Sequence, residues 1–190
     1  MIFEILMAGS FVIFGLFAGV MAGLFGIGGG TLLIPFLLTV FSRLDFNHQL
    51  DMHVAVATSL ALILPTAIAS SISHLKNNHL DTLMAKRWIP GVCFGVGLGV
   101  LCLHLFSAIF LKLIFSIYLL FCIGYNLINS QIHYNEKDLI PWQYLALPSI
   151  AIGFLSTLLG VGGGTFTTPV LKFFHYPLRC ALGLSAFTGL

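Results

Sequence analysis

The amino-acid sequence predicts an all-α polytopic membrane protein of two homologous repeats with glycine-broken helices, the second repeat being incomplete. Three observations support this prediction: an apolar composition, long apolar segments and a repeated glycine cluster. Hydrophobic residues make up 58% of the 190 residues and charged residues only 7%, whereas soluble domains carry about 25% charged residues. With a mean hydropathy of +1.05, the chain could not face water without large apolar patches.

The apolar segments are long enough to cross a bilayer, which takes about 20 residues of helix. They cover residues 5–41, 52–73, 88–107, 110–130, 142–175 and 180–190. The first and the fifth are too long for one crossing, and each has a glycine cluster near its middle. We therefore expect each of these two segments to form a helix, a break at the glycines, and a second, shorter helix.

The two glycine clusters have nearly the same sequence, Gly-Ile-Gly-Gly-Gly at residues 26–30 and Gly-Val-Gly-Gly-Gly at residues 160–164. A threonine follows each cluster directly, and a proline follows four residues later. Threonine is a favourable N-cap, and proline is tolerated near the start of a helix. The shorter helices are therefore expected to begin at Thr31 and Thr165.

The clusters belong to an internal repeat, because residues 24–37 match residues 158–171 at eight of fourteen positions. Repeats with helices broken at corresponding places are typical of secondary transporters. We divide the chain into a first repeat, 1–135, and a partial second repeat, 136–190. The last two apolar segments of the first repeat have no counterpart, so we expect a truncated chain lacking about 70 residues of a two-repeat protein.

Glycines also recur at every fourth position in two segments: Gly15, Gly19 and Gly23 in one, and Gly91, Gly95 and Gly99 in the other. Glycines at this interval lie on one helix face and let a neighbouring backbone approach closely. Both sets are predicted to serve helix packing.

The glycine breaks are the predicted functional site. Irregular backbone in a membrane is tolerated only where it is buried in protein or lines a cavity. A helix start presents unpaired N–H groups and a partial positive charge, which suit an anion, and glycine leaves room for a ligand. We assign substrate binding to the breaks and to nearby hydroxyls: Gly26, Gly28, Gly29, Gly30, Thr31, Thr58, Ser59, Gly160, Gly162, Gly163, Gly164, Thr165 and Ser185.

Two alternatives remain open for the polar side chains around this site. The Thr and Ser hydroxyls either line an anion pathway or bond back to the carbonyl one turn earlier in their own helix. Lys172 either adds positive charge near the site or extends toward the membrane interface. Lys112, between two apolar segments, is predicted to be a loop residue.

Other classes of function find little support. No GxxxxGK[ST] motif occurs, and Gly26-x-Gly28 is followed by Thr31 where a dinucleotide-binding fingerprint needs glycine. The four cysteines are widely spaced, and the histidines fall in predicted loops without the convergent ligands of a metal site. A net charge of +2 provides no basic patch for nucleic acid. We therefore expect no enzyme activity, cofactor, metal or nucleic-acid partner.

Several motifs together resemble the sulfite exporter TauE/SafE family of membrane permeases. They are Gly19-x-x-x-Gly23-Leu24-Phe25 followed by the first cluster and Pro35, then Ala57-Thr58-Ser59, and the second cluster with Pro169. Leu184-Ser185 departs from the Thr-Ser of the first copy. The resemblance implies a secondary permease for small sulfur-containing anions, such as sulfite, sulfonates or sulfoacetate, or for related organic anions.

The expected protein is thus a multi-pass, secondary-active permease of the inner membrane that moves small anions by alternating access. Its expected partners are the anion, the lipid bilayer and a coupling proton or other ion. Two alternatives come from other classes. The chain is a non-transporting membrane assembly component or truncated remnant, or it is a thiol-redox membrane protein that uses its cysteines.

Overall fold

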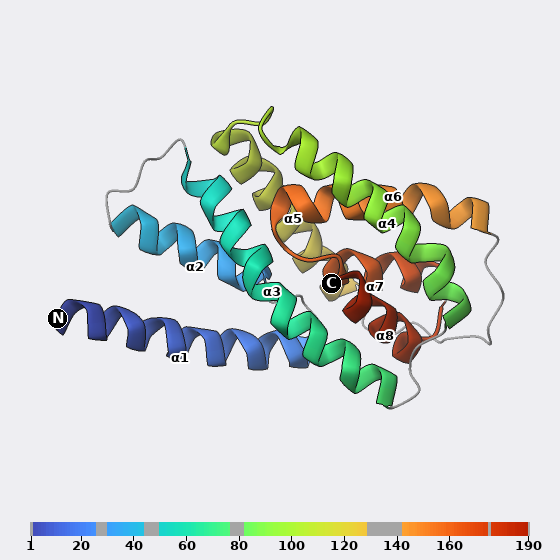
Figure 1. Cartoon of the computed structure of the whole chain (residues 1–190), viewed down its shortest axis with the longest axis horizontal. Coiled ribbons are helices and arrows are strands. Elements are labelled where there is room, and N and C mark those ends of the chain that lie inside the picture. Colours follow the sequence, from blue (N-terminus) through green and yellow to red (C-terminus); the bar gives the residue numbers. More distant parts are fainter. Residues whose placement is uncertain are drawn as a thin grey trace.

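The computed structural model describes residues 2–25, 30–43, 50–76, 82–128, 142–174 and 176–189. Over these ranges the chain forms eight α-helices and no strand, which confirms the all-α prediction (Figure 1). The helices are α1 (Ile2–Phe25), α2 (Gly30–Arg43), α3 (Asp51–Lys76), α4 (Thr82–Leu103), α5 (Ala108–Ile128), α6 (Trp142–Leu159), α7 (Gly164–Phe173) and α8 (Leu178–Thr188).

The fifth apolar segment is interrupted at the predicted place, because helices α6 and α7 flank residues 160–163. In the first segment, α1 ends at Phe25 and α2 begins at Gly30, and residues 26–29 lie outside the described part of the chain. Of the predicted site residues, Gly26, Gly28 and Gly29 lie outside the described part of the chain. The repeat boundary near residue 135 also lies outside it, so the division into two repeats stays a prediction.

The expected starts of the shorter helices at Thr31 and Thr165 are wrong by one residue. Helix α2 begins at Gly30 and helix α7 begins at Gly164. At α7 the reason is local, because the N-cap position belongs to Gly163 and carries no side-chain cap bond. The Thr165 hydroxyl instead bonds back toward the break, so threonine does not act as the cap.

Helices α4 and α6 form the most extensive helix pair and cross closely in Figure 1. A Cβ atom on Gly95 would overlap the carbonyl of Ile150, and one on Gly153 would overlap the carbonyl of Val92. The glycines therefore let two backbones touch, as predicted for the 91–99 set. The α1 glycines differ, since a Cβ on Gly15 or Gly19 would meet nothing within 4 Å.

Two buried apolar cores lie on either side of the second glycine break. The first joins α2, α3, α5 and the end of α6, and includes Ile34, Val56, Leu111, Tyr118 and Leu158. The second joins α4, the start of α6, α7 and α8, and includes Trp88, Val92, Leu145, Leu171 and Leu184. Residues 160–163 connect these cores, so the break lies at a junction inside the protein.

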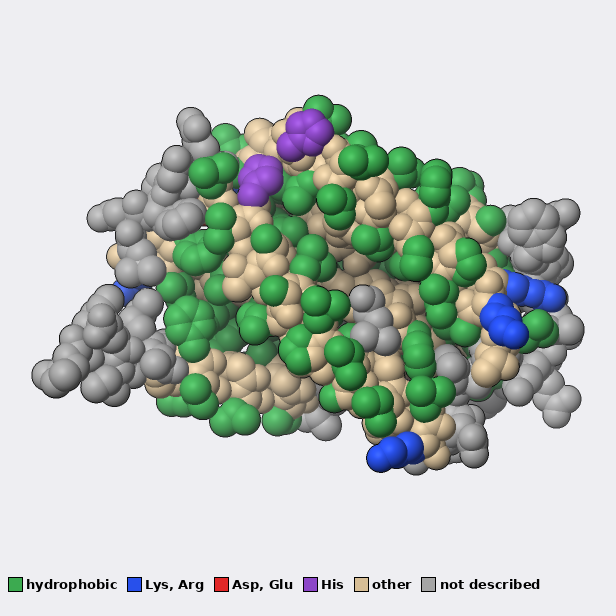
Figure 2. All heavy atoms as spheres, in the orientation of Figure 1, with side chains coloured by type: hydrophobic (Ala, Val, Ile, Leu, Met, Phe, Trp, Pro, Cys, Tyr) green, Lys and Arg blue, Asp and Glu red, His purple; other side chains and the backbone are tan. Residues whose placement is uncertain are grey.

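The outer surface is apolar. Figure 2 shows hydrophobic side chains over most of the visible face, with Lys and Arg side chains toward its margins. Among the described residues, α3 and α4 are long and apolar enough to cross a membrane by length and composition. Shorter apolar stretches cover Phe11–Met21, Gly30–Arg43, Ala108–Gly124 and Leu145–Leu159. This surface belongs to an all-α membrane protein.

Candidate functional site

The start of α2, which follows the first glycine cluster, packs against the second glycine break. A Cβ atom on Gly30 would lie 2.5 Å from the carbonyl oxygen of Gly160 and 2.7 Å from the Cα atom of Val161. This distance leaves no room for any side chain, so the backbone at the start of α2 packs directly against the backbone of the second break. Gly30 and its neighbour Thr31 are both buried.

Helix α3 runs along the second break and makes a polar contact with it. Ser59 is fully buried, and its hydroxyl donates to the carbonyl oxygen of Gly160 at 2.7 Å. Val56 lies one turn away, and its Cα atom would be 2.8 Å from a Cβ on Gly160. Ser59 thus satisfies a carbonyl that the break removes from regular helix hydrogen bonding.

The break itself needs glycine for its backbone conformation. Gly160 has a φ angle of 63° and Gly162 has a φ angle of 78°. Both lie in the left-handed region, where a side chain is strained. Between them, the Val161 amide donates to the Ser156 carbonyl at 3.3 Å, a bond that closes the C-terminal end of α6. The spacing of the glycines therefore follows from the geometry of the turn.

Hydroxyl groups cover the carbonyl oxygens of the second break, one after another. The bonds are Ser59 to Gly160 at 2.7 Å, Thr165 to Gly162 at 3.1 Å, Thr167 to Gly163 at 2.7 Å and Thr168 to Gly164 at 3.3 Å. These bonds engage the acceptor side of the break. At the donor side, the amides of the first turn of α7 have no acceptor one turn earlier within that helix. The polarity left at the start of α7 is therefore that of N–H donors, which favours negative charge.

Helix α8 closes over the start of α7. A Cβ atom on Gly163 would lie 2.5 Å from the carbonyl oxygen of Thr188, and one on Gly164 would lie 3.1 Å from that of Ser185. The Ser185 hydroxyl itself donates to the Leu182 carbonyl at 2.8 Å. Ser185 is therefore next to the break through its backbone, while its hydroxyl bonds within α8.

Two predicted polar residues are not brought into the break. The Thr58 hydroxyl donates to the Val54 carbonyl at 2.7 Å, one turn earlier in α3, so it bonds back to its own helix. Lys172 lies eight residues after the start of α7, which is about 12 Å along a helix axis. Its position in the last turn suits the negative end of the helix dipole and is remote from the break.

One apolar side chain lies against both breaks. The Cδ1 atom of Ile63 would be 3.0 Å from a Cβ on Gly30 and 3.3 Å from a Cβ on Gly162. Ile63 belongs to α3, one helical turn beyond Ser59, and is buried. Ile63 was not among the predicted site residues, because nothing in the apolar pattern of α3 distinguishes it from its neighbours.

Tyr118 of α5 is a second residue that the sequence analysis missed. Its ring packs on Phe166 in the first turn of α7, with ring centroids 4.5 Å apart. Its hydroxyl lies near the side chains of Thr165 and Cys122. A tyrosine within an otherwise apolar helix is the signal that could have found it, because a phenol hydroxyl in such surroundings needs a partner.

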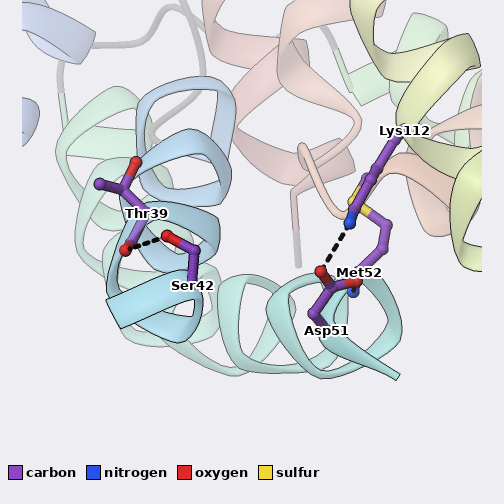
Figure 3. A network of polar contacts seen from close by, with 5 residues as sticks. All are labelled: Thr39, Ser42, Asp51, Met52 and Lys112. Carbon is purple, nitrogen blue, oxygen red and sulfur yellow. Dashed lines mark hydrogen bonds and ion pairs between the residues drawn. The ribbon is translucent and has the colours of Figure 1, made fainter. Parts of the chain in front are cut away.

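An ion pair lies at the opposite end of α3 from its lysine-bearing last turn (Figure 3). Lys112 Nζ is 2.5 Å from Asp51 Oδ2, and Asp51 Oδ1 accepts the Met52 amide at 2.6 Å. Lys112 lies inside α5 rather than in a loop, so that prediction was wrong. Next to the pair, His53 Nε2 lies 3.0 Å from the Phe106 carbonyl oxygen. The sequence signal for this pair was the presence of two opposite charges, Asp51 and Lys112, in or beside apolar segments.

The geometry of the described residues supports neither a metal site nor chemistry at the cysteines. Within the described ranges, no group of three or more His, Cys, Asp or Glu residues is placed to hold a metal ion. Cys93, Cys102, Cys122 and Cys180 form no disulfide.

Comparison with known proteins identifies related chains. The family model for sulfite exporter TauE/SafE matches residues 11–190. A "probable membrane transporter protein" of Haemophilus influenzae is 32% identical over 181 residues, covering 93% of this chain and 67% of the relative. A protein of the same description from Methanocaldococcus jannaschii is 30% identical, covering 92% of this chain and 65% of the relative.

A third relative, the "probable membrane transporter protein YunE" of Bacillus subtilis, is 26% identical, covering 93% of this chain and 71% of the relative. The chain thus spans about two thirds of the length of these relatives. No solved structure matches it. From the match over most of its length, this chain belongs to the sulfite exporter TauE/SafE family.

Proposed function

We propose that the chain is a secondary-active permease that moves small sulfur-containing or organic anions, such as sulfite or sulfonates, across the inner membrane. Membership of the TauE/SafE family and relatives described as probable membrane transporters support the permease class. The apolar, all-helical structure fits the same class. The geometry around the glycine breaks supports a negatively charged substrate.

The observation that supports an anionic substrate is the set of hydrogen bonds from hydroxyl groups to carbonyl oxygens of the second break. Four Ser and Thr hydroxyls donate to four of the five carbonyl oxygens of residues 160–164, those of Gly160, Gly162, Gly163 and Gly164. Because those carbonyls are engaged, the start of α7 acts as a cluster of N–H donors beside the backbone of the first break. Such donors replace part of the hydration shell of an anion without burying a full positive charge.

The mechanism we propose is alternating access at this junction. Helices α2 and α3 pack together, as do α7 and α8, and the two units meet where Gly30 abuts Gly160. Rocking of the first repeat against the second would open the breaks to one side of the membrane and then to the other. A coupling proton or other ion supplies the energy in this proposal.

The test is uptake of radiolabelled sulfite by proteoliposomes that contain the full chain. Thr165→Val keeps the shape of the side chain and uncovers the Gly162 carbonyl. We expect sulfite flux to fall about fivefold, the cost of one polar group placed against the anion. The control is Thr66→Val, because Thr66 bonds back to the Ile63 carbonyl at 2.7 Å in α3, away from the break.

A second test measures thermal unfolding of the wild-type chain with and without sulfite. A ligand that binds the folded protein raises its apparent melting temperature, so sulfite should raise that of the wild-type chain in detergent. A folded wild-type chain that neither responds to sulfite nor transports it would contradict the proposal. That result would favour a non-transporting membrane assembly component.

A further inference from the structure

The hydroxyl of Tyr118 is a buried polar group to which the proposed mechanism assigns no role. Tyr118 is 6% exposed and belongs to the first apolar core. Among the described residues, no hydrogen-bond partner satisfies its hydroxyl oxygen. Buried hydroxyls are nearly always hydrogen-bonded, so an unpartnered one at a candidate site points to a ligand.

The position of this hydroxyl connects it to the start of α7. The Tyr118 ring packs on Phe166, the third residue of that helix, with 4.5 Å between centroids and 39° between ring planes. The hydroxyl lies near the Thr165 and Cys122 side chains, but it forms a hydrogen bond to neither of them. The phenol O–H therefore remains as a donor beside the first-turn amides of a ten-residue helix.

We propose that Tyr118 is a specificity-determining residue that donates a hydrogen bond to an oxygen of the bound anion. Phenol O–H groups form short, directional bonds to charged oxygen acceptors, whereas a halide offers no oxygen. The amides of α7 and the phenol together would thus select oxyanions, with sulfonate-like groups as the substrate class, over halides. This inference rests on the proposed anion site.

The test compares Tyr118→Phe with wild type in sulfite and chloride binding, measured by calorimetry on the full chain in nanodiscs. Phenylalanine keeps the ring that packs on Phe166 and removes only the donor. We expect the dissociation constant for sulfite to rise about tenfold, as for loss of a hydrogen bond to a charged group. The weak binding of chloride should stay as it is.

The matched control is Tyr176→Phe, because Tyr176 is also 6% exposed and belongs to the second core, away from Thr165. A second readout is the infrared difference spectrum between sulfite-bound and sulfite-free wild type, which should contain a tyrosine C–O band. In folded variants, Tyr118→Phe should remove this band and Tyr176→Phe should retain it.

The outcomes separate this inference from the proposed function. If sulfite binds Tyr118→Phe as tightly as wild type while Thr165→Val loses flux, Tyr118 is not a donor and the permease proposal stands. A wild-type difference spectrum without a tyrosine band overturns the inference in the same way. If sulfite fails to bind the wild type, both proposals fail.

Discussion

The hydroxyl of Ser59 donates to the carbonyl oxygen of Gly160 at 2.7 Å, joining residues 101 positions apart in the chain. The donor lies on α3, and the acceptor is the first residue of the second glycine break. Both groups are buried, so the bond replaces a helix hydrogen bond that the break has removed. It also ties α3 to the second glycine break.

The first prediction concerns this bond. Ser59→Ala leaves the Gly160 carbonyl buried without its hydroxyl donor, and we expect the free energy of unfolding to fall by about 1–3 kcal/mol. The control is Ser116→Ala, since the exposed Ser116 bonds only within α5 at 2.9 Å and should change stability by less than about 0.5 kcal/mol. The measurement is chemical unfolding in detergent, and equal midpoints for the two variants would count against the role of Ser59.

A second prediction uses two glycines of the same helix. Gly95→Ala would push a methyl group into the Ile150 carbonyl, whereas a methyl group at Gly97 meets nothing within 4 Å. We expect Gly95→Ala to destabilise the protein by about 1–3 kcal/mol through overpacking of α4 on α6. Gly97→Ala should be neutral or stabilising by up to about 1 kcal/mol, because alanine is the better helix former. If both variants unfold at the same denaturant concentration, α4 does not pack on α6 through this face.

The position of the second break could be predicted from the sequence, because a glycine cluster in a long apolar segment has a large effect on local backbone. The exact helix starts could not, since Gly163 serves as N-cap without a side-chain bond. For the adjacent residues Thr58 and Ser59, the sequence likewise could not show which hydroxyl reaches the break. Successive residues of a helix point about 100° apart, so one reaches Gly160 and the other bonds back to Val54.

Long-range partners could not be predicted at all. Lys112 was predicted to be a loop residue because it lies close to the boundary between two apolar segments, but α5 begins at Ala108 and includes it. Its partner Asp51 lies 61 residues earlier in the chain. Tyr118 meets Phe166 in the same way, through packing of α5 on the start of α7. Periodicity within a segment carries no information about which distant segment lies beside it.

A third prediction addresses the Asp51–Lys112 pair. Asp51 is 8% exposed and Lys112 is 37% exposed, so removing the lysine leaves a nearly buried carboxylate without its cation. Loss of one partner from a fully buried pair costs about 3–5 kcal/mol. Because the lysine is partly solvated, we expect Lys112→Met to destabilise the protein by about 1–2 kcal/mol.

A double-mutant cycle checks this third prediction. Asp51→Asn in the Lys112→Met background should cost less than Asp51→Asn alone, because the lysine that pairs with the carboxylate is already absent. The control for loss of a positive charge is Lys86→Met, at an exposed position of α4. Strictly additive effects in the unfolding free energy would show that the two side chains do not interact.

A fourth prediction concerns Ile63, whose Cδ1 atom faces both breaks at 3.0 and 3.3 Å from the Cβ positions of Gly30 and Gly162. An apolar side chain here would limit the size of an anion held between the breaks. Ile63→Val removes that one methyl group at a cost of about 0.5–1.5 kcal/mol, so the protein should still fold. We expect flux of a bulky sulfonate, such as benzenesulfonate, to rise relative to flux of sulfite. Ile72→Val, on an exposed face of α3, should leave the ratio unchanged, and an unchanged ratio in Ile63→Val would place the anion elsewhere.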